Sequence, residues 1–466
     1  MLRLNKRFGP WSFYKEALAI ALPVMMQQFI MSMVSLIDNF MVAGLGDISM
    51  AAVNVTNHLC FVYVVFVNAI CQAGGIYIAQ FRGAGDNDGM KHAYRFKIVF
   101  LTILAALFFV LDRNFSRPMI ALMTAGNAAQ SEIVSVGSEY FRLVAWTFLP
   151  IGISSAIGTS FREIARPKVP LIISALATLV NTAGNWILIY GNLGAPRLEV
   201  AGAAYATIIA RLFEMAVFML YAARAKAPFF VGIIRFFHFH KQLIREIFFK
   251  SGMIFISELS WVSSETIMIA MYNRRGGAEV VAGMAAGWTI ANIFFLLFGG
   301  IWTTAAVLVG GSLGAGKIDE ARRRAEWLKS GSVVAGLILA APGAVVSALL
   351  IPLVFSNLSA EARVNCLGLV LVILVYLPLW GVLNVQYAIS RAGGDTAMGM
   401  ITDLSVNTIL FVPGAFLLSF LTPIPPVPMF AILKLSDVVK YFICRYYLRK
   451  ERWVKNLTKK TVPVSS

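Results

Sequence analysis

Seven acidic residues lie within long apolar stretches of this chain, where a charged side chain is costly to bury. Ionisable residues in such a setting bind ions or substrates, relay protons or form ion pairs with one another. The chemistry to expect of them is therefore the reversible binding of a proton or another cation. The seven are Asp38, Glu139, Glu214, Glu258, Glu265, Asp403 and Asp437.

Asp38 has no basic residue within a helical turn. It lies six residues before Gly44, where the first apolar helix is expected to reach the outer face of a membrane. The helical rise places it about 9 Å below that face. A buried carboxylate without a cationic partner can bind and release a proton near neutral pH. The alternative is a carboxylate that amide hydrogen bonds hold ionised for structure alone.

Asn181 and Asn185 are four residues apart in another apolar stretch, so they share one helix face. Asn185 lies six residues before Gly191, at nearly the same depth as Asp38. Asp38 and these amides could together hold a proton or, through their oxygen atoms, a sodium ion. The alternative is that the amides only join neighbouring helices.

Glu258 and Glu265 are seven residues apart, so they lie about two turns apart on one helix face. The helical rise places Glu265 about 12 Å below the outer end of its helix at Asn273. We expect both to bind a cation or a substrate in the second half of the chain.

Two other acids have basic residues close by in the sequence. Glu214 follows Arg211 by three residues, and Asp437 lies between Lys434 and Lys440. Residues at this spacing contact each other on a helix. We expect both acids to form local ion pairs.

Asp403 lies near the cytoplasmic end of its predicted helix. It could line a cavity open to the cytoplasm, or it could cap a polar network.

Pro23 removes a backbone hydrogen bond fifteen residues before Asp38. We expect it to act as a hinge that lets the first helix bend when the Asp38 site changes protonation.

The apolar stretches that carry these residues are long enough to span a membrane. Of the 466 residues, 59% are apolar and 14% are charged, whereas soluble globular proteins carry about 25% charged residues. This composition excludes an ordinary cytosolic enzyme and a disordered chain. A spanning helix needs about 20 apolar residues, and backbone polar groups in lipid must be satisfied internally. We predict an all-α membrane protein with twelve transmembrane helices, over residues roughly 16–43, 50–81, 92–112, 131–158, 169–191, 200–222, 251–273, 279–312, 328–351, 362–389, 396–420 and 427–447.

The basic residues predict the orientation. The chain has 40 Lys and Arg residues and a formal net charge of +17. With both termini on one side, thirty of them fall on that side and six on the other, and basic loops favour the cytoplasm. We expect a multi-pass protein of the bacterial inner (plasma) membrane with both termini cytoplasmic. The positive charge then contacts anionic lipid headgroups, and no nucleic-acid partner is expected.

Motifs of common enzymes are absent from the sequence. It has no GxxxxGK[ST] phosphate loop and no HExxH zinc motif. The four cysteines have neither metal nor redox spacing. We expect no enzymatic activity, no catalytic residue and no cofactor.

An internal repeat divides the chain into halves. The turn QFRGAGD at 80–86 recurs as GSLGAGK at 311–317, and each follows a long apolar stretch. We expect two six-helix lobes, at 1–223 and at 251–466, the second with a basic cytoplasmic tail. Residues 224–250 between them are basic and aromatic, which is typical of a cytoplasmic linker with an interfacial helix. Repeats of this kind are common in secondary transporters.

Several motifs, in order along essentially the whole chain, resemble the multidrug and toxic compound extrusion (MATE) transporters. That resemblance implies two lobes around a cleft and export of drugs, organic cations among them, in exchange for protons or sodium ions. We expect a monomer that exports small-molecule drugs across the lipid bilayer. A lipid-linked oligosaccharide flippase of the same superfamily is the alternative. The motifs are LPVMMQQFIMSMVSLIDNFMVAGLGDISMAAV (22–53), RGAGD (82–86), RPKVP (166–170), NWILIYG (185–191), GAAYATIIAR (202–211) and ISRAGGDT (389–396).

The resemblance also implies roles for individual residues. The family carries an acid at the position of Asp38 and an asparagine at that of Asn181, but many proton-coupled members have an aspartate where this chain has Asn185. Sodium-coupled members resemble this chain at Glu265 and pair that glutamate with an aspartate on the tenth helix. The matching stretch, 377–390, has no acid, and its only amides are Asn384 and Gln386. Sodium is therefore expected at Asp38 or at Glu265, with Asn384 and Gln386 as candidate contacts in the second lobe.

Overall fold

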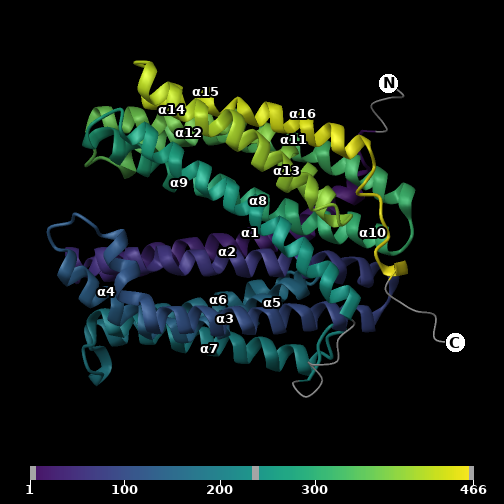
Figure 1. Ribbon diagram of the computed structural model, residues 1–466, viewed down its shortest axis with the longest axis horizontal. Helices are drawn as coiled ribbons and strands as arrows, with labels where there is room; N and C mark the ends of the chain where they lie inside the picture. Colours follow the sequence, from purple (N-terminus) through teal and green to yellow (C-terminus); the bar gives the residue numbers. More distant parts are fainter. Residues whose placement is uncertain (1–6, 233–240, 461–466) are drawn as a thin grey trace. The chain divides into compact units, whose positions relative to one another are not determined.

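The computed structural model describes residues 7–232 and 241–460, and these ranges are helical without a strand (Figure 1). The predicted all-α membrane fold is confirmed. Residues 233–240, in the middle of the expected linker, lie outside the described residues. The next long helix begins at Lys241, inside the range expected for the linker.

Helices in the first half of the chain cover each of the first six predicted spans. The fourth span is built from two helices joined by a 3₁₀ turn at Ala145–Thr147. The helices are α1 (Trp11–Ala43), α2 (Asp47–Ala84), α3 (Asn87–Met123), α4 (Gln130–Val144), α5 (Phe148–Glu163), α6 (Lys168–Tyr190) and α7 (Glu199–Arg224).

Helices in the second half cover the other six spans. Two of these spans contain a short π-helical turn, at Ala306–Gly310 and at Asn407–Phe411. The helices are α8 (Lys241–Asn273), α9 (Ala278–Ala305), α10 (Gly311–Gly314), α11 (Ile318–Val354), α12 (Ala360–Ala392), α13 (Ala397–Val406), α14 (Val412–Leu421), α15 (Pro426–Lys434) and α16 (Ser436–Arg449).

Eleven helical segments of the described ranges are each long and apolar enough to cross a membrane. The twelfth predicted span is α15 followed by α16. Leu435 separates them, but its backbone angles (φ −60°, ψ −24°) are themselves helical. Figure 1 shows the two helices following one another along one line. The last span is therefore a nearly continuous helix, and its predicted bounds, 427–447, contain four charged residues: Lys434, Asp437, Lys440 and Arg445.

Prolines explain two of the irregular turns. Pro150 has no amide hydrogen and cannot bond to the carbonyl of Trp146, which lies within the 3₁₀ turn before α5. Pro413 likewise leaves the carbonyl of Ile409 free, and Ile409 lies within the π-helical turn before α14.

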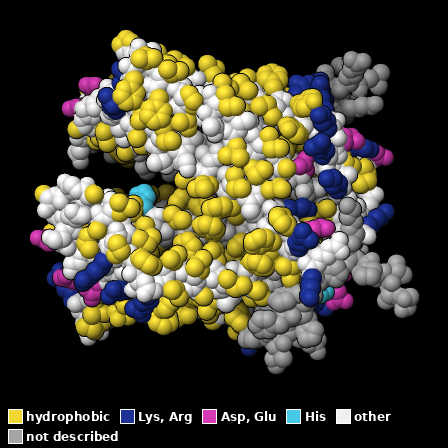
Figure 2. Space-filling view, viewed as in Figure 1, with side chains coloured by type: hydrophobic (Ala, Val, Ile, Leu, Met, Phe, Trp, Pro, Cys, Tyr) yellow, Lys and Arg dark blue, Asp and Glu magenta, His cyan; other side chains and the backbone are white. Residues whose placement is uncertain are grey.

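The described chain divides into two compact units. Unit 1 comprises Met1–Met25, Ala79–Gly85 and Gly252–Ser466, and unit 2 comprises Met26–Ile78 and Asp86–Ser251. The long helices α1, α2 and α8 each pass from one unit to the other. Each unit has its own buried apolar core. Figure 2 shows hydrophobic side chains over the middle of the helices and charged side chains toward their ends, as a membrane protein requires.

The two copies of the glycine turn adopt the same backbone conformation. Gly85 and Gly316, at matching positions of the repeat, have φ of +73° and +74°, which favours glycine over other residues. Gly83 and Gly314 also match. A Cβ atom on Gly83 would lie 1.9 Å from the Gly311 carbonyl oxygen, and one on Gly314 would lie 1.8 Å from that of Gln80. The repeated glycines therefore permit a close helix contact within unit 1.

Candidate functional site

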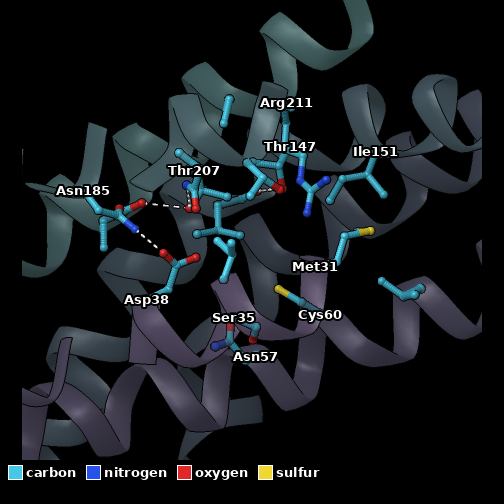
Figure 3. A pocket seen from close by; sticks show the side chains of 18 of the residues that line it. Met31, Ser35, Asp38, Asn57, Cys60, Thr147, Ile151, Asn185, Thr207 and Arg211 are labelled. Atoms are coloured by element: carbon cyan, nitrogen blue, oxygen red, sulfur yellow. Dashed lines mark hydrogen bonds between the residues drawn. The ribbon is translucent and has the colours of Figure 1, made fainter. Parts of the chain in front are cut away.

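Unit 2 contains a cavity of about 390 Å³ between α1, α2, α4, α5, α6 and α7. Small-molecule sites typically measure about 300–1,000 Å³. Its walls are mostly apolar and aromatic, with polar groups from several helices (Figure 3). The polar and charged side chains include Ser35, Asp38, Asn39, Asn57, Tyr63, Tyr140, Thr147, Ser174, Thr178, Asn181, Asn185, Thr207, Arg211 and Glu214.

Asp38 and Asn185 contact each other in this cavity. The amide Nδ2 of Asn185 donates a hydrogen bond of 2.7 Å to Oδ1 of Asp38 (Figure 3). The contact agrees with the equal depth that the sequence predicted for the two residues. Oδ1 of Asn185 is buried and has no hydrogen-bond partner among the described residues. The carboxylate of Asp38 and the unpartnered amide oxygen of Asn185 therefore belong to two side chains that are hydrogen-bonded to each other.

A second polar group in the cavity is an ion pair. Arg211 Nη1 donates to Glu214 Oε2 at 2.8 Å, which confirms the predicted local pair. Glu214 Oε1 accepts from Ser174 Oγ at 2.8 Å, and Ser174 Oγ accepts from Gln27 Nε2 at the same distance. These bonds fix the glutamate, and none of the ion pairs found among the described residues involves Asp38.

Asn181 lies on the same face of α6 as Asn185 but makes a weaker contact. Its Nδ2 lies 3.4 Å from Thr207 Oγ1 on α7, at the outer limit of a hydrogen bond. Pro23 lies inside α1, two residues before that helix passes from unit 1 to unit 2. Its role as a hinge stays a prediction.

In unit 1 the predicted cation-binding residue Glu265 forms an ion pair. The ammonium of Lys434 donates to Oε1 of Glu265. Oε2 of Glu265 is buried and has no hydrogen-bond partner among the described residues. The sequence placed Lys434 beside Asp437 instead, and the lysine reaches across from α15 to α8.

Glu258 also has a cationic partner. Arg391 Nη1 donates to Glu258 Oε1 at 3.1 Å, and the guanidinium lies over the ring of Trp302. Trp302 Nε1 in turn donates to Asn384 Oδ1 at 3.0 Å. Glu258 and Asn384 are therefore linked through two side chains. The fourth candidate in this unit, Gln386, is buried, and its Oε1 has no partner among the described residues.

Asp403 is the centre of a polar network in unit 1. Its carboxylate accepts hydrogen bonds from Ser257 Oγ and, at 2.8 Å, from the Tyr387 hydroxyl. The ammonium of Lys440 lies 3.3 Å from Asp403 Oδ1 and 3.7 Å from Asp437 Oδ1. The local pair of Asp437 and Lys440 was predicted, whereas the link to Asp403 was not.

The sequence interpretation missed one buried pair altogether. Lys97 Nζ contacts both carboxylate oxygens of Glu163, at 3.0 Å and 2.7 Å, within unit 2. Lys97 is fully buried, and it lies inside the third predicted span, 92–112, to which no functional residue had been assigned. The sequence feature that could have revealed this pair is the position of Lys97, ten residues into a long helix. Among the described residues, no group of three or more His, Cys, Asp or Glu side chains could hold a metal ion.

A helical membrane protein with an internal repeat and polar side chains around an intramembrane cavity belongs to the class of multi-pass transporters. The family model MatE matches this chain twice, at residues 23–187 and 254–417. The two matches begin 231 residues apart, which is the separation of the two glycine turns. The chain therefore belongs to the MATE family of transporters.

Several named bacterial proteins are similar to it. The probable multidrug resistance protein NorM of Halalkalibacterium halodurans is 22% identical over 88% of this chain and 89% of its own length. The multidrug resistance protein MdtK of Yersinia enterocolitica is 21% identical over the same shares.

Solved structures share the fold at lower identity. The outward-facing conformation of a multidrug resistance MATE family transporter has a TM-score of 0.78 at 18% identity, covering 94% of this chain and 95% of that one. The Vibrio cholerae MATE transporter VcmN in its bent form has a TM-score of 0.82 at 16% identity, covering 95% of this chain and 99% of that one.

Proposed function

We propose that this transporter is a secondary-active multidrug exporter. It exchanges lipophilic organic cations for protons or sodium ions by alternating access of its two halves. The relatives named multidrug resistance proteins support export of drugs. The composition of the unit 2 cavity supports the cationic class, because its apolar walls suit lipophilic molecules and Asp38 supplies a negative charge.

The observation that carries this proposal is the contact between Asp38 and Asn185 inside the cavity. The carboxylate can bind a proton, or it can bind sodium together with the free amide oxygen of Asn185. A drug cation in the same cavity competes for the same negative charge. Competition of this kind couples the entry of one cation to the exit of another, because the two cannot occupy the site together.

Other residues have supporting roles in this proposal. Asn181 lines the cavity next to Asn185, and Pro23 lets α1 bend as Asp38 gains or loses its cation. Glu258, Asn384 and Gln386 remain predicted contacts for a cation or substrate in unit 1. Glu265 is paired with Lys434, so its predicted binding of a free cation would require that pair to open. We further propose that the protein works as a monomer in the bacterial inner membrane, with both termini in the cytoplasm.

A lipid-linked oligosaccharide flippase would need basic side chains free to bind a pyrophosphate. Among the residues that line the cavity, Arg211 is the one lysine or arginine, and it is paired with Glu214. The cavity therefore favours a cationic substrate over a pyrophosphate-linked lipid.

Efflux of a fluorescent lipophilic cation from proteoliposomes tests the proposal. An imposed pH gradient, an imposed sodium gradient and no gradient are compared on the wild-type protein. We expect one of the two gradients to drive efflux against the concentration difference. Equal efflux under all three conditions would refute secondary-active export, and rapid flip of a labelled pyrophosphate-linked lipid would favour the flippase.

A further inference from the structure

The ammonium of Lys434 lies among three buried aromatic rings of unit 1. It is 5.7 Å from the ring centroid of Trp380, 5.0 Å from that of Phe411 and 5.4 Å from that of Phe430. A cation within about 6 Å of a ring face is attracted by the ring's negative face. Aromatic groups of this kind recognise alkylammonium ions, and here the ion belongs to the protein itself.

Glu265 completes this group with a negative charge. It forms an ion pair with Lys434, and both side chains are largely buried. The second carboxylate oxygen, Oε2, is buried and has no hydrogen-bond partner among the described residues. The carboxylate is therefore only partly satisfied by the lysine, and it retains capacity to accept from another donor.

Hydrogen bonds and ring contacts hold the aromatic groups in place without the lysine. Trp380 Nε1 donates to Asp437 Oδ2 at 2.8 Å. The ring of Phe430 packs edge-on against Trp288 at 5.8 Å, and Trp288 Nε1 donates to the Tyr272 hydroxyl at 2.9 Å. These partners do not depend on Lys434, so the rings are expected to keep their places when the lysine is replaced.

We propose that Trp380, Phe411, Phe430 and Glu265 form a binding site for a primary alkylammonium ion, and that Lys434 is its built-in occupant. The lysine holds the carboxylate and the rings together, so free cations do not reach Glu265 in the wild-type protein. Lys434 thereby determines specificity, since it reserves the exchange of free cations for the site in unit 2. The predicted binding of a cation by Glu265 would then require removal of the lysine.

The site is tested by removing most of the lysine side chain by mutation and supplying the removed part as a free ligand. Lys434→Ala removes three methylene groups and the ammonium, which correspond to n-propylammonium. The thermal unfolding midpoint of the purified protein is measured against n-propylammonium concentration, because a ligand that binds only the folded state raises it. We expect a saturable rise for Lys434→Ala and none for the wild-type protein. A variant that responds no more than the wild type would overturn the proposal.

Three controls separate the site from nonspecific effects. 1-Propanol has the same chain without the charge and should give no rise. Lys434→Met fills the space of the lysine stem, and it should not respond to n-propylammonium. Lys434→Ala combined with Glu265→Gln removes the carboxylate and should lose the response. An equal rise in any of these controls would contradict the assigned site.

Lys434→Ala could fail to fold alone, since it leaves Glu265 buried without a partner. In that case the variant is expressed and purified with n-propylammonium or with 1-propanol at the same concentration. Recovery of monodisperse protein only with the ammonium ion supports the proposal. Equal recovery with both compounds, or with neither, refutes it. This test measures binding alone, so its failure leaves the proposed transport function untouched.

Discussion

The two units place acids inside the membrane in different surroundings. In unit 2, Asp38 accepts a hydrogen bond from a neutral amide, that of Asn185, in a cavity large enough for a small molecule. In unit 1, Glu258, Glu265 and Asp403 each contact an arginine or a lysine. A carboxylate with a neutral partner can exchange cations, whereas one held by a fixed cation is already neutralised. Unit 2 has paired acids too, Glu163 with Lys97 and Glu214 with Arg211, so we infer that Asp38 is the acid that sets the two halves apart.

Asp38→Asn should have the largest effect on transport. The substitution keeps the size of the side chain but removes the group that binds the cation. We expect gradient-driven efflux in proteoliposomes to fall to the level of protein-free liposomes.

Asp47→Asn is a suitable control for it, because Asp47 is an exposed acid at the start of α2 in the same unit. This variant should transport at the wild-type rate. Normal gradient-driven efflux by Asp38→Asn would show that the coupling ion binds elsewhere.

Glu265→Gln should affect stability more than transport. It leaves the ammonium of Lys434 buried without its counter-ion, and loss of one partner of a buried pair costs about 3–5 kcal/mol. We expect the free energy of unfolding in detergent to fall by about this amount.

Combining Glu265→Gln with Lys434→Met removes both charges together and should recover most of the lost stability. The double variant should also keep gradient-driven efflux. If it loses efflux while remaining as stable as the wild type, the pair in unit 1 takes part in coupling and the contrast between the units fails.

Asn185→Ala tests whether the amide acts on Asp38 and which ion is bound. A hydrogen bond to a charged group contributes about 1.5–3 kcal/mol, which corresponds to roughly a 10- to 100-fold change in affinity. Loss of the donor makes the ionised carboxylate less favourable, so a proton-driven transporter should reach its half-maximal rate at higher pH. A sodium-driven one should need more sodium, because an oxygen ligand is lost. No shift in either profile would mean that the amide is structural.

Asn181→Ala should have the smallest effect. Its contact with Thr207 is long and only partly buried, so we expect less than about 1 kcal/mol of lost stability and an efflux rate close to that of the wild type. If Asn181→Ala loses as much efflux as Asp38→Asn, the coupling site is centred nearer to α7 than to Asp38.

The sequence predicted contacts that follow from distance along one helix or from equal depth in the membrane. The pair of Arg211 and Glu214 is three residues apart, and the helical repeat brings them together. Asp38 and Asn185 lie equally far from glycines that end their helices, so counting residues was enough to predict their shared depth. The fold class followed from the length of the apolar stretches for the same reason.

Contacts between helices that are distant in sequence could not be predicted in this way. Lys434 and Glu265 are separated by 169 residues, and no periodicity relates α15 to α8. Lys434 also lies next to Asp437 in the sequence, so the local partner was the natural expectation. Which acid a membrane lysine contacts depends on how helices pack and rotate, and the apolar pattern of the twelfth span leaves that rotation open.

The competition between drug and coupling ion is the most direct test of the difference between the units. The affinity of the purified protein for a fluorescent lipophilic cation is measured over a range of pH and of sodium concentration. Wild type, Asp38→Asn and the double variant of Glu265→Gln with Lys434→Met are compared. We expect the wild type and the double variant to show the same dependence on one of the two ions, and Asp38→Asn to show none. A full dependence in Asp38→Asn, with its loss in the double variant, would contradict the account.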